Sequence, residues 1–329
     1  MLRTIACNVL GIAHPICQAG MANYTSPGLV AAVSNAGGLG VHGALARHPA
    51  ELRELLRATR ELAGDRPFGV NHVVPRLDEV AFALCLAERV PVLCFSWGDP
   101  GPWARWAHEA GAVVVCQVTT PAEVPAMLAA GADVLIAQGT EAGGHSGFLP
   151  LAALLPAVVD AAGAVPVLAA GGIVDGRGLA SALALGAAGG WLGTRFLATP
   201  EAPVSAAWKG AIIAAGAGAT VHTAAFDRLW GQDWPGGRVR ALRNRFTDAW
   251  DGREAALAGR LAEIRQAVWR AEREDDPALI ALMAGAGAGA IRDIRPAGDL
   301  VREIAAEAAA TIQGLGRLLV DGRGATEAG

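Results

Sequence analysis

The segment VPVLAAGGIVDGRGLASALALGAAGGWLGTRF (165–196) places two apolar runs, 165–169 and 190–193, on either side of a helix-like stretch at 177–185. Runs that are apolar at nearly every position are typical of parallel strands covered on both faces. A helix is the usual connection between two such strands. The segment therefore predicts a strand–helix–strand unit.

The same alternation extends back to the start of the chain. Six further apolar runs lie at 16–19, 38–41, 68–71, 91–95, 112–117 and 133–137. Helix-like stretches, among them 49–62, 76–87 and 121–130, separate these runs. Eight such units favour a closed (β/α)8 TIM barrel over a doubly wound sheet, which would more often have five or six strands and a glycine fingerprint after the first. That fingerprint is absent from the sequence.

The pattern changes after about residue 203, where Ala/Gly-rich helical sequence, five of the nine tryptophans and a charged segment at 253–276 follow. We therefore expect a barrel at 1–204 and a mostly helical addition at 205–290. Apolar residues at helical spacing over 296–319 predict a C-terminal helix, within 291–329, that returns to the barrel.

Composition and charge exclude several classes of protein. The net charge is −4, and no basic run carries interleaved aromatics, so nucleic acid is not an expected partner. The N-terminus is too weakly basic and apolar for a secretory signal, which predicts a cytoplasmic protein. The apolar stretch 149–174 is long enough to span a membrane, but Pro156, Asp160, Gly163 and Pro166 interrupt it. A buried helix followed by a strand is expected there instead.

The cysteines give no sign of a metal site. All five lie in apolar runs and none has CxxC spacing. This pattern predicts buried structural thiols rather than metal ligands or disulfides.

The loops after the last two predicted strands indicate a phosphate site, since these loops commonly hold phosphate in such barrels. The seventh strand ends in Gly171 and Gly172, where the lack of Cβ atoms lets backbone N–H groups approach an anion. The eighth ends at Gly193 and Thr194, with a helix start behind them. Glycine pairs are also common turn formers, but their occurrence after both strands favours the phosphate site.

The loop after the sixth strand, QGTEAGGHSG (138–147), carries the strongest catalytic candidate. His145 stands in a glycine-rich loop at the catalytic end of a strand, and imidazole can accept or donate a proton near neutral pH. Glu141 is expected to orient the loop. His42 and His72 follow the second and third strands and are weaker candidates for lining the pocket. Four arginines, Arg47, Arg76, Arg105 and Arg195, fall near the predicted mouth without forming a cluster.

Six segments carry further motifs: PICQAGMANYTSPGLVAAVSNAGGLG (15–40), PFGVN (67–71), GADVLIAQGTEAGGHSG (131–147), VPVLAAGGIVDGRGLASALALGA (165–187), LGTRFLATPEAP (192–203) and RALRNRFTDAW (240–250). In this order they resemble the successive motifs of the nitronate monooxygenase (2-nitropropane dioxygenase) family, over most of the chain. The resemblance implies non-covalent FMN and His145 as the catalytic histidine. The positions that match the family's FMN contacts are Gly20, Met21, Asn71, Gln117, Gln138, Gly143, Gly171, Gly172, Gly193 and Thr194.

The implied activity is the oxidation of alkyl nitronates, and of nitroalkanes, by O2 to carbonyl compounds and nitrite. FMN-dependent enoyl-ACP reductases and NAD(P)H:quinone reductases have similar scaffolds and an EAGGH-like loop, so a reductase is the alternative. A third possibility is a protein that binds flavin without catalysing a reaction. The protein could also form a homodimer.

Two positions depart from the family pattern. Ala286 stands where the family often has Gln, which removes a polar contact near the flavin. Trp97, in the loop after the fourth strand, is bulkier than expected: it either narrows the substrate pocket or packs beneath the helical addition.

Overall fold

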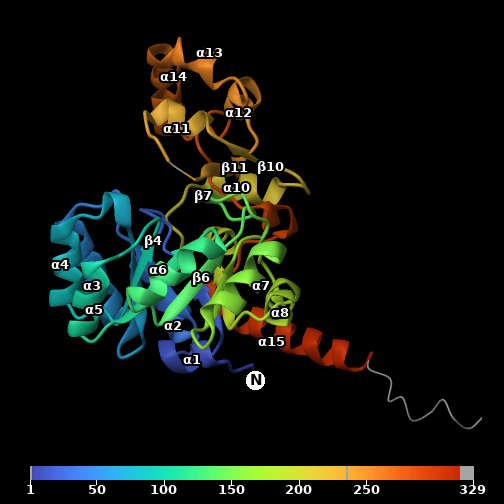
Figure 1. Cartoon of the computed structure of the whole chain (residues 1–329). Coiled ribbons are helices and arrows are strands. Elements are labelled where there is room, and N and C mark those ends of the chain that lie inside the picture. Colours follow the sequence, from blue (N-terminus) through green and yellow to red (C-terminus); the bar gives the residue numbers. More distant parts are fainter. Residues whose placement is uncertain (1, 235, 319–329) are drawn as a thin grey trace, which may run out of the picture.

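The computed structural model describes residues 2–234 and 236–318. Eight parallel strands close into a barrel in the order β1-β2-β3-β4-β5-β6-β8-β9 (Figure 1). The strands are β1 (Ile16–Gln18), β2 (Leu39–Gly43), β3 (Phe68–Val73), β4 (Val92–Ser96), β5 (Val113–Val118), β6 (Val134–Gln138), β8 (Val167–Ala170) and β9 (Gly189–Leu192). Each of the eight predicted runs overlaps one of them, which confirms the TIM-barrel fold.

Helices connect and cover the barrel strands. Those that belong to the barrel are α1 (Ile5–Leu10), α2 (Pro27–Asn35), α3 (Pro49–Ala63), α4 (Glu79–Ala87), α5 (Pro102–Glu109), α6 (Val124–Ala129), α7 (Leu151–Ala162), α8 (Gly176–Ala184) and α9 (Thr194–Leu197). Short 3-10 turns, η1 (Val74–Arg76) and η2 (Pro121–Glu123), precede α4 and α6. The apolar stretch 149–174 forms α7 and β8, as predicted, and within the described residues no helix is both long and apolar enough to cross a bilayer.

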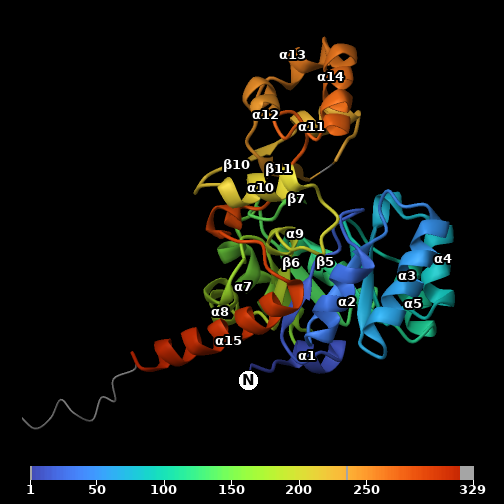
Figure 2. The same ribbon diagram turned by 180° about the vertical axis from the view of Figure 1, so that it is seen from behind.

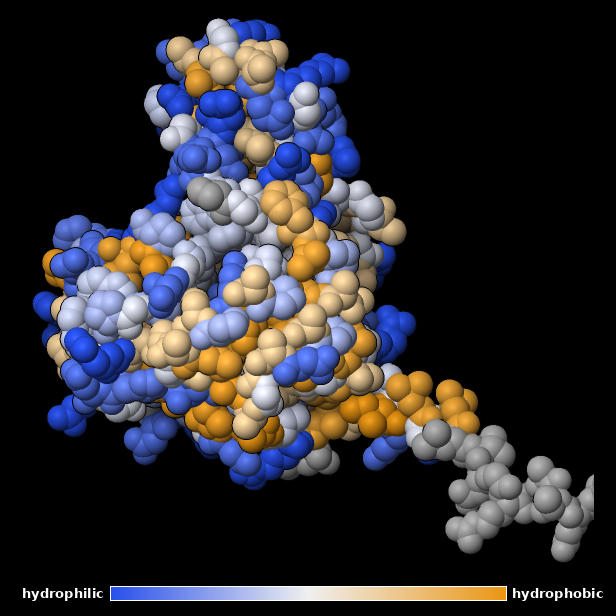
Figure 3. All heavy atoms as spheres, viewed as in Figure 1, coloured by the Kyte–Doolittle hydropathy of each residue, from blue (hydrophilic) through white to orange (hydrophobic). Residues whose placement is uncertain are grey.

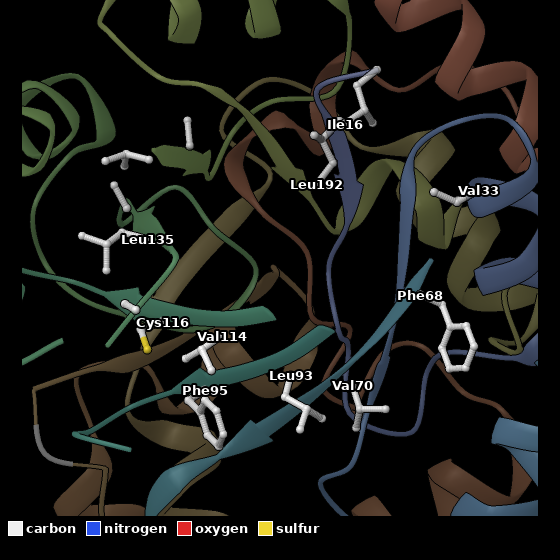
Figure 4. Close-up of a cluster of buried hydrophobic side chains, with 14 of the residues drawn as sticks. Ile16, Val33, Phe68, Val70, Leu93, Phe95, Val114, Cys116, Leu135 and Leu192 are labelled. Carbon is white, nitrogen blue, oxygen red and sulfur yellow. The ribbon is translucent and has the colours of Figure 1, made fainter. Parts of the chain in front are cut away.

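Alternate residues of each strand enter two different apolar layers. Phe68 and Val70 of β3, with Leu93 and Phe95 of β4, point outward against the covering helices (Figure 4). The intervening positions, such as Cys94 of β4, fill the inside of the barrel. This two-residue period determines which side chains at the strand ends face the barrel axis.

Residues after the barrel form a cap over the carboxyl ends of the strands, above the barrel in Figures 1 and 2. Its helices are α10 (Ala206–Ala214), α11 (Ala225–Trp230), α12 (Arg245–Trp250), α13 (Glu254–Ala258) and α14 (Leu261–Glu274). The segment 205–290 also contains two strands that the sequence did not predict, β10 (Thr220–Thr223) and β11 (Arg238–Leu242). They form an antiparallel sheet of order β10-β11-β7 with β7 (Gly144–Ser146), which belongs to the barrel's sixth loop.

The last helix, α15 (Ala297–Gly316), returns to the barrel and packs against α8 and α2. Leu300, Val301 and Ile304 bury their side chains in the layer between strands and helices. The end of the predicted C-terminal segment, 319–329, lies outside the described residues. In Figure 3 the outer end of the cap is mainly polar, whereas apolar side chains gather on the barrel below it.

Candidate active site

A cavity of about 430 Å³ lies at the carboxyl ends of the barrel strands, beneath the cap. This is the end of a TIM barrel at which active sites are found. The predicted catalytic histidine and all ten predicted cofactor-binding residues line this cavity: His145, Gly20, Met21, Asn71, Gln117, Gln138, Gly143, Gly171, Gly172, Gly193 and Thr194. The structure thus brings together residues from six segments that are separate in the sequence.

Amide and hydroxyl side chains form one wall of the cavity. The Asn71 amide donates to the Ser96 hydroxyl over 3.3 Å, and the Gln117 amide donates to the Gln138 side-chain oxygen over 3.0 Å. All four residues continue the inward-facing series of their strands, at or near the carboxyl end, which is why they face the axis. Ser96 was not predicted, although the same alternation along β4 indicates it.

The loops after β8 and β9 form the opposite wall. Gly171 and Gly172 have φ values of 118° and 73°, a region that L-residues with side chains rarely adopt. Within the described residues the Gly172 backbone N–H has no hydrogen-bond acceptor. An anion in the cavity would satisfy this donor. The Thr194 hydroxyl accepts a hydrogen bond from the Gly285 N–H over 2.9 Å, and a hydroxyl retains its own proton to donate.

The segment AGAGAGA (284–290) closes the cavity through close backbone contact. A Cβ added at Gly285 would lie 2.6 Å from the Glu141 carbonyl oxygen, and one at Gly287 would lie 2.6 Å from the Gly172 carbonyl oxygen. Gly285 and Gly287 line the cavity, whereas Ala286 does not and instead donates its N–H to the Glu141 carbonyl over 2.8 Å. Glu141 also accepts the Leu151 N–H with its carboxylate, which holds the sixth loop in place.

His145 lies on a strand of the cap sheet, where the sequence predicted a loop. It is the central residue of β7, paired with Val239 of β11. Its Nε2 lies 2.7 Å from an Oδ1 of Asp227, at the start of α11, and its ring stacks on Trp234 with centroids 3.8 Å apart and an interplanar angle of 11°. Neither partner was predicted, because the Asp227 contact spans 82 residues and no local motif marks either residue.

The position of Trp97 is compatible with both alternatives that the sequence left open. It lines the cavity, and its ring packs edge-on against Trp234 of the cap, with centroids 5.3 Å apart. Its φ of 64° is unusual for a bulky side chain, so the surrounding contacts hold it in a strained conformation. Arg76 also lines the cavity and lies over the Trp234 ring, 5.0 Å from its centroid.

His42 and His72 do not line the cavity, so these weaker candidates were wrong. Both side chains point from β2 and β3 into the layer beneath the helices, because their positions alternate with the inward-facing ones. Burial, with Arg47 nearby, lowers the pKa of His42 to about 3, and burial lowers the pKa of His72 to about 4. Such imidazoles stay neutral and cannot reach a substrate.

Of the arginines near the predicted mouth, only Arg76 lines the cavity. Arg47 and Arg195 are buried, and their guanidinium groups pair with Glu51 and Asp293 over 2.6 Å. All five cysteines are buried and free. Within residues 2–234 and 236–318, no three His, Cys, Asp or Glu side chains come together in a way that could hold a metal ion.

A family model described as nitronate monooxygenase matches residues 3–83 and 78–307 of the chain. The chain belongs to the nitronate monooxygenase family. Members are flavin-dependent oxidoreductases, so this chain is an enzyme that acts on a small-molecule substrate with a flavin cofactor.

Individual relatives of this nitronate monooxygenase family member carry different names. A Mycobacterium tuberculosis protein named (3aS,4S,5R,7aS)-5-hydroxy-7a-methyl-1-oxo-octahydro-1H-indene-4-carboxyl-CoA dehydrogenase is 38% identical over 287 residues, which cover 83% of this chain and 78% of that protein. FabK from Thermotoga maritima has a TM-score of 0.87 and 35% identity, covering 97% of this chain and 100% of FabK. Nitroalkane oxidase from Streptomyces ansochromogenes has a TM-score of 0.83 and 32% identity, covering 94% and 99%.

Proposed function

We propose that this enzyme binds FMN and uses it to oxidise alkyl nitronates with O2, giving a carbonyl compound and nitrite. The observation that supports this most strongly is the presence of His145 in the same cavity as the polar strand ends and the glycine loops. The family match and the nitroalkane oxidase neighbour favour a nitro-compound substrate.

The chemistry of the cavity residues supports FMN as the cofactor. The Gly171–Gly172 loop, with its free N–H at Gly172, and the Gly193–Thr194 turn would hold the phosphate. A cradle of this kind would hold a single phosphate group, as FMN carries, which favours FMN over FAD. The amides of Asn71, Gln117 and Gln138 would hydrogen-bond the polar edge of the isoalloxazine ring.

Gly20 and Gly143 allow the backbone to pack closely against other residues that line the cavity. A Cβ at Gly20 would lie 2.6 Å from the Asn71 Cβ, and one at Gly143 would lie 2.7 Å from the Gly285 nitrogen. Met21 lines the same side of the cavity, beside Gly193. These close contacts help to position the polar side chains of the cavity. A larger residue at Gly20 or Gly143 would displace those side chains.

FMN, when bound, supplies the redox chemistry that connects substrate oxidation to O2. The protein's own contribution is to bind and orient the substrate and to control a proton. His145 would hydrogen-bond the nitro group of a nitronate, which is already deprotonated. When the substrate is a neutral nitroalkane, His145 would also remove the proton from the α-carbon. Trp97 and Trp234 would exclude water from the space beside the imidazole.

A second candidate is a flavin-dependent dehydrogenase or reductase of an acyl thioester. The M. tuberculosis relative, at 38% identity, is named for dehydrogenation of a carboxyl-CoA compound. This candidate differs from the first in its electron partner: a reductase takes hydride from NAD(P)H, whereas a dehydrogenase passes the electrons of its substrate to an acceptor other than O2.

Steady-state assays distinguish the candidates. The purified protein should release FMN on denaturation and consume O2 with propionate 3-nitronate, forming nitrite. Oxidation of NADPH with a crotonyl thioester, or of NADH with a quinone, in the absence of nitronate turnover would instead establish a reductase. Colourless protein that cannot be reconstituted with FMN would contradict the cofactor assignment.

A further inference from the structure

Asp227 is a buried carboxylate whose one side-chain hydrogen bond among the described residues is with His145. The side chains of Asp227 and His145 are only 8% and 12% exposed, and the Nε2–Oδ1 distance is 2.7 Å. Asp227 does not line the cavity, whereas His145 does. An aspartate placed behind a pocket histidine, and withdrawn from the pocket itself, can act on a substrate only through that histidine.

The contact decides which imidazole nitrogen carries the proton. An ionised carboxylate can only accept hydrogen bonds, so Nε2 must donate to Asp227. In the neutral ring Nδ1 is then the nitrogen with a free lone pair, and within the described residues it makes no hydrogen bond. Nδ1 is therefore the atom that can accept a proton or hydrogen bond from a substrate.

Charged groups on the neighbouring elements do not replace this contact. Arg240 of β11 donates to the Thr140 carbonyl over 2.6 Å, and Arg238 lies over the Phe148 ring. Arg76 lies over the Trp234 ring. Trp234 restricts the imidazole by stacking but offers no acceptor to either ring nitrogen, so among residues 2–234 and 236–318 only Asp227 distinguishes the two nitrogens.

We propose that Asp227 is a positioning residue that fixes His145 as the Nε2–H tautomer and presents Nδ1 to the substrate. This inference rests on the proposed role of His145 in turnover, but the tautomer itself is a property of the protein that can be measured without a substrate. The cap therefore contributes to the chemistry as well as to the enclosure of the site.

The tautomer can be read directly from the ¹⁵N chemical shifts of the His145 ring in the FMN-loaded enzyme, assigned by comparison with His145→Ala. We expect the Nε2–H pattern in the wild type and a mixture of both tautomers in Asp227→Asn, which keeps the shape but removes the charge. Asp248→Asn removes the same charge from an exposed cap position and should leave the His145 signals unchanged. A wild-type ring with its proton on Nδ1, or an unchanged tautomer in Asp227→Asn, would overturn the proposal.

Activity provides the second measurement. With a neutral nitroalkane as substrate, Asp227→Asn should lower kcat by roughly 10²-fold with little change in KM, because a misoriented base affects the proton step more than binding. Flavin content and thermal midpoint close to those of the wild type would show that the cap is intact. If the tautomer shifts but no nitronate is turned over even by the wild type, the proposed function fails while the inference about Asp227 stands. An altered tautomer with full activity would show that the contact is only structural.

Discussion

The two sides of the active-site cavity differ in how they are built. On the barrel side, the direction of each strand side chain follows from the two-residue period of a strand. This period turns the amides of Asn71, Gln117 and Gln138 towards the cavity. On the cap side, the imidazole of His145 is oriented by Asp227 and Trp234, which lie more than 80 residues away in the chain. The barrel side depends on local periodicity, whereas the cap side depends on long-range packing.

This difference suggests a division of roles that substitutions can test. The barrel side and the glycine loops would hold the cofactor, and the cap side would control the substrate and its proton. Changes in each region should then affect different measurements.

Replacement of the catalytic candidate should have the largest effect. His145→Ala is expected to keep FMN, since the proposed phosphate cradle lies elsewhere, and to lower kcat/KM by roughly 10²–10⁴-fold, as is typical of a lost acid–base group. The loss should be greater with a neutral nitroalkane than with its nitronate, because only the nitroalkane needs a proton removed. Wild-type rates on both forms, with FMN bound, would make His145 a structural residue.

A change in the glycine loop should affect cofactor binding first. Gly172→Val forces a β-branched side chain into a φ of 73°, a strain of about 1–3 kcal/mol, and places methyl groups at the proposed phosphate cradle. FMN affinity should fall by roughly 10–100-fold, measured by fluorescence titration of the apoprotein. Gly64→Val, at a φ of 59° on the surface between α3 and β3, is a control for strain alone. Equal FMN affinity in both variants would show that the Gly171–Gly172 loop does not bind the cofactor.

The buried histidines of the barrel wall should affect stability without affecting turnover. His72 has a pKa of about 4 in the folded state against an ordinary value of 6.5, so between these pH values the unfolded chain binds the extra proton. The free energy of unfolding therefore decreases as the pH falls from 6.5 towards 4, by up to about 1.4 kcal/mol per pH unit.

His72→Phe should remove this dependence, because the ring sits between Phe82 and Phe95 and its Nε2 has no partner among the described residues. Urea unfolding at pH 7 and pH 5 should show a smaller difference for the variant than for the wild type. An identical pH dependence in both proteins, or a large loss of kcat, would contradict the placement of His72 outside the site.

The smallest effect is expected at Trp97, where the barrel and the cap meet. Trp97→Phe keeps an aromatic ring but withdraws the edge that packs against Trp234, so the cavity becomes wider. We expect KM for a small nitronate to rise about threefold, with kcat nearly unchanged, and bulkier nitronates to become better substrates. Unchanged KM values across a series of chain lengths would show that Trp97 only packs beneath the cap.

The sequence by itself determined the barrel and much of its chemistry. Eight apolar runs separated by helices allow few folds other than a barrel. Once the fold is known, a residue at the carboxyl end of a strand, such as Gly172 or Gln138, is expected near the site. Tertiary structure alone decided the rest. The cap sheet has short strands without a distinct pattern, so the sequence predicts a loop where the structure has β7 with His145. The pairing of His145 with Asp227 arises only when α11 packs over the barrel mouth, because a contact between residues 82 positions apart leaves no periodic signal in the chain.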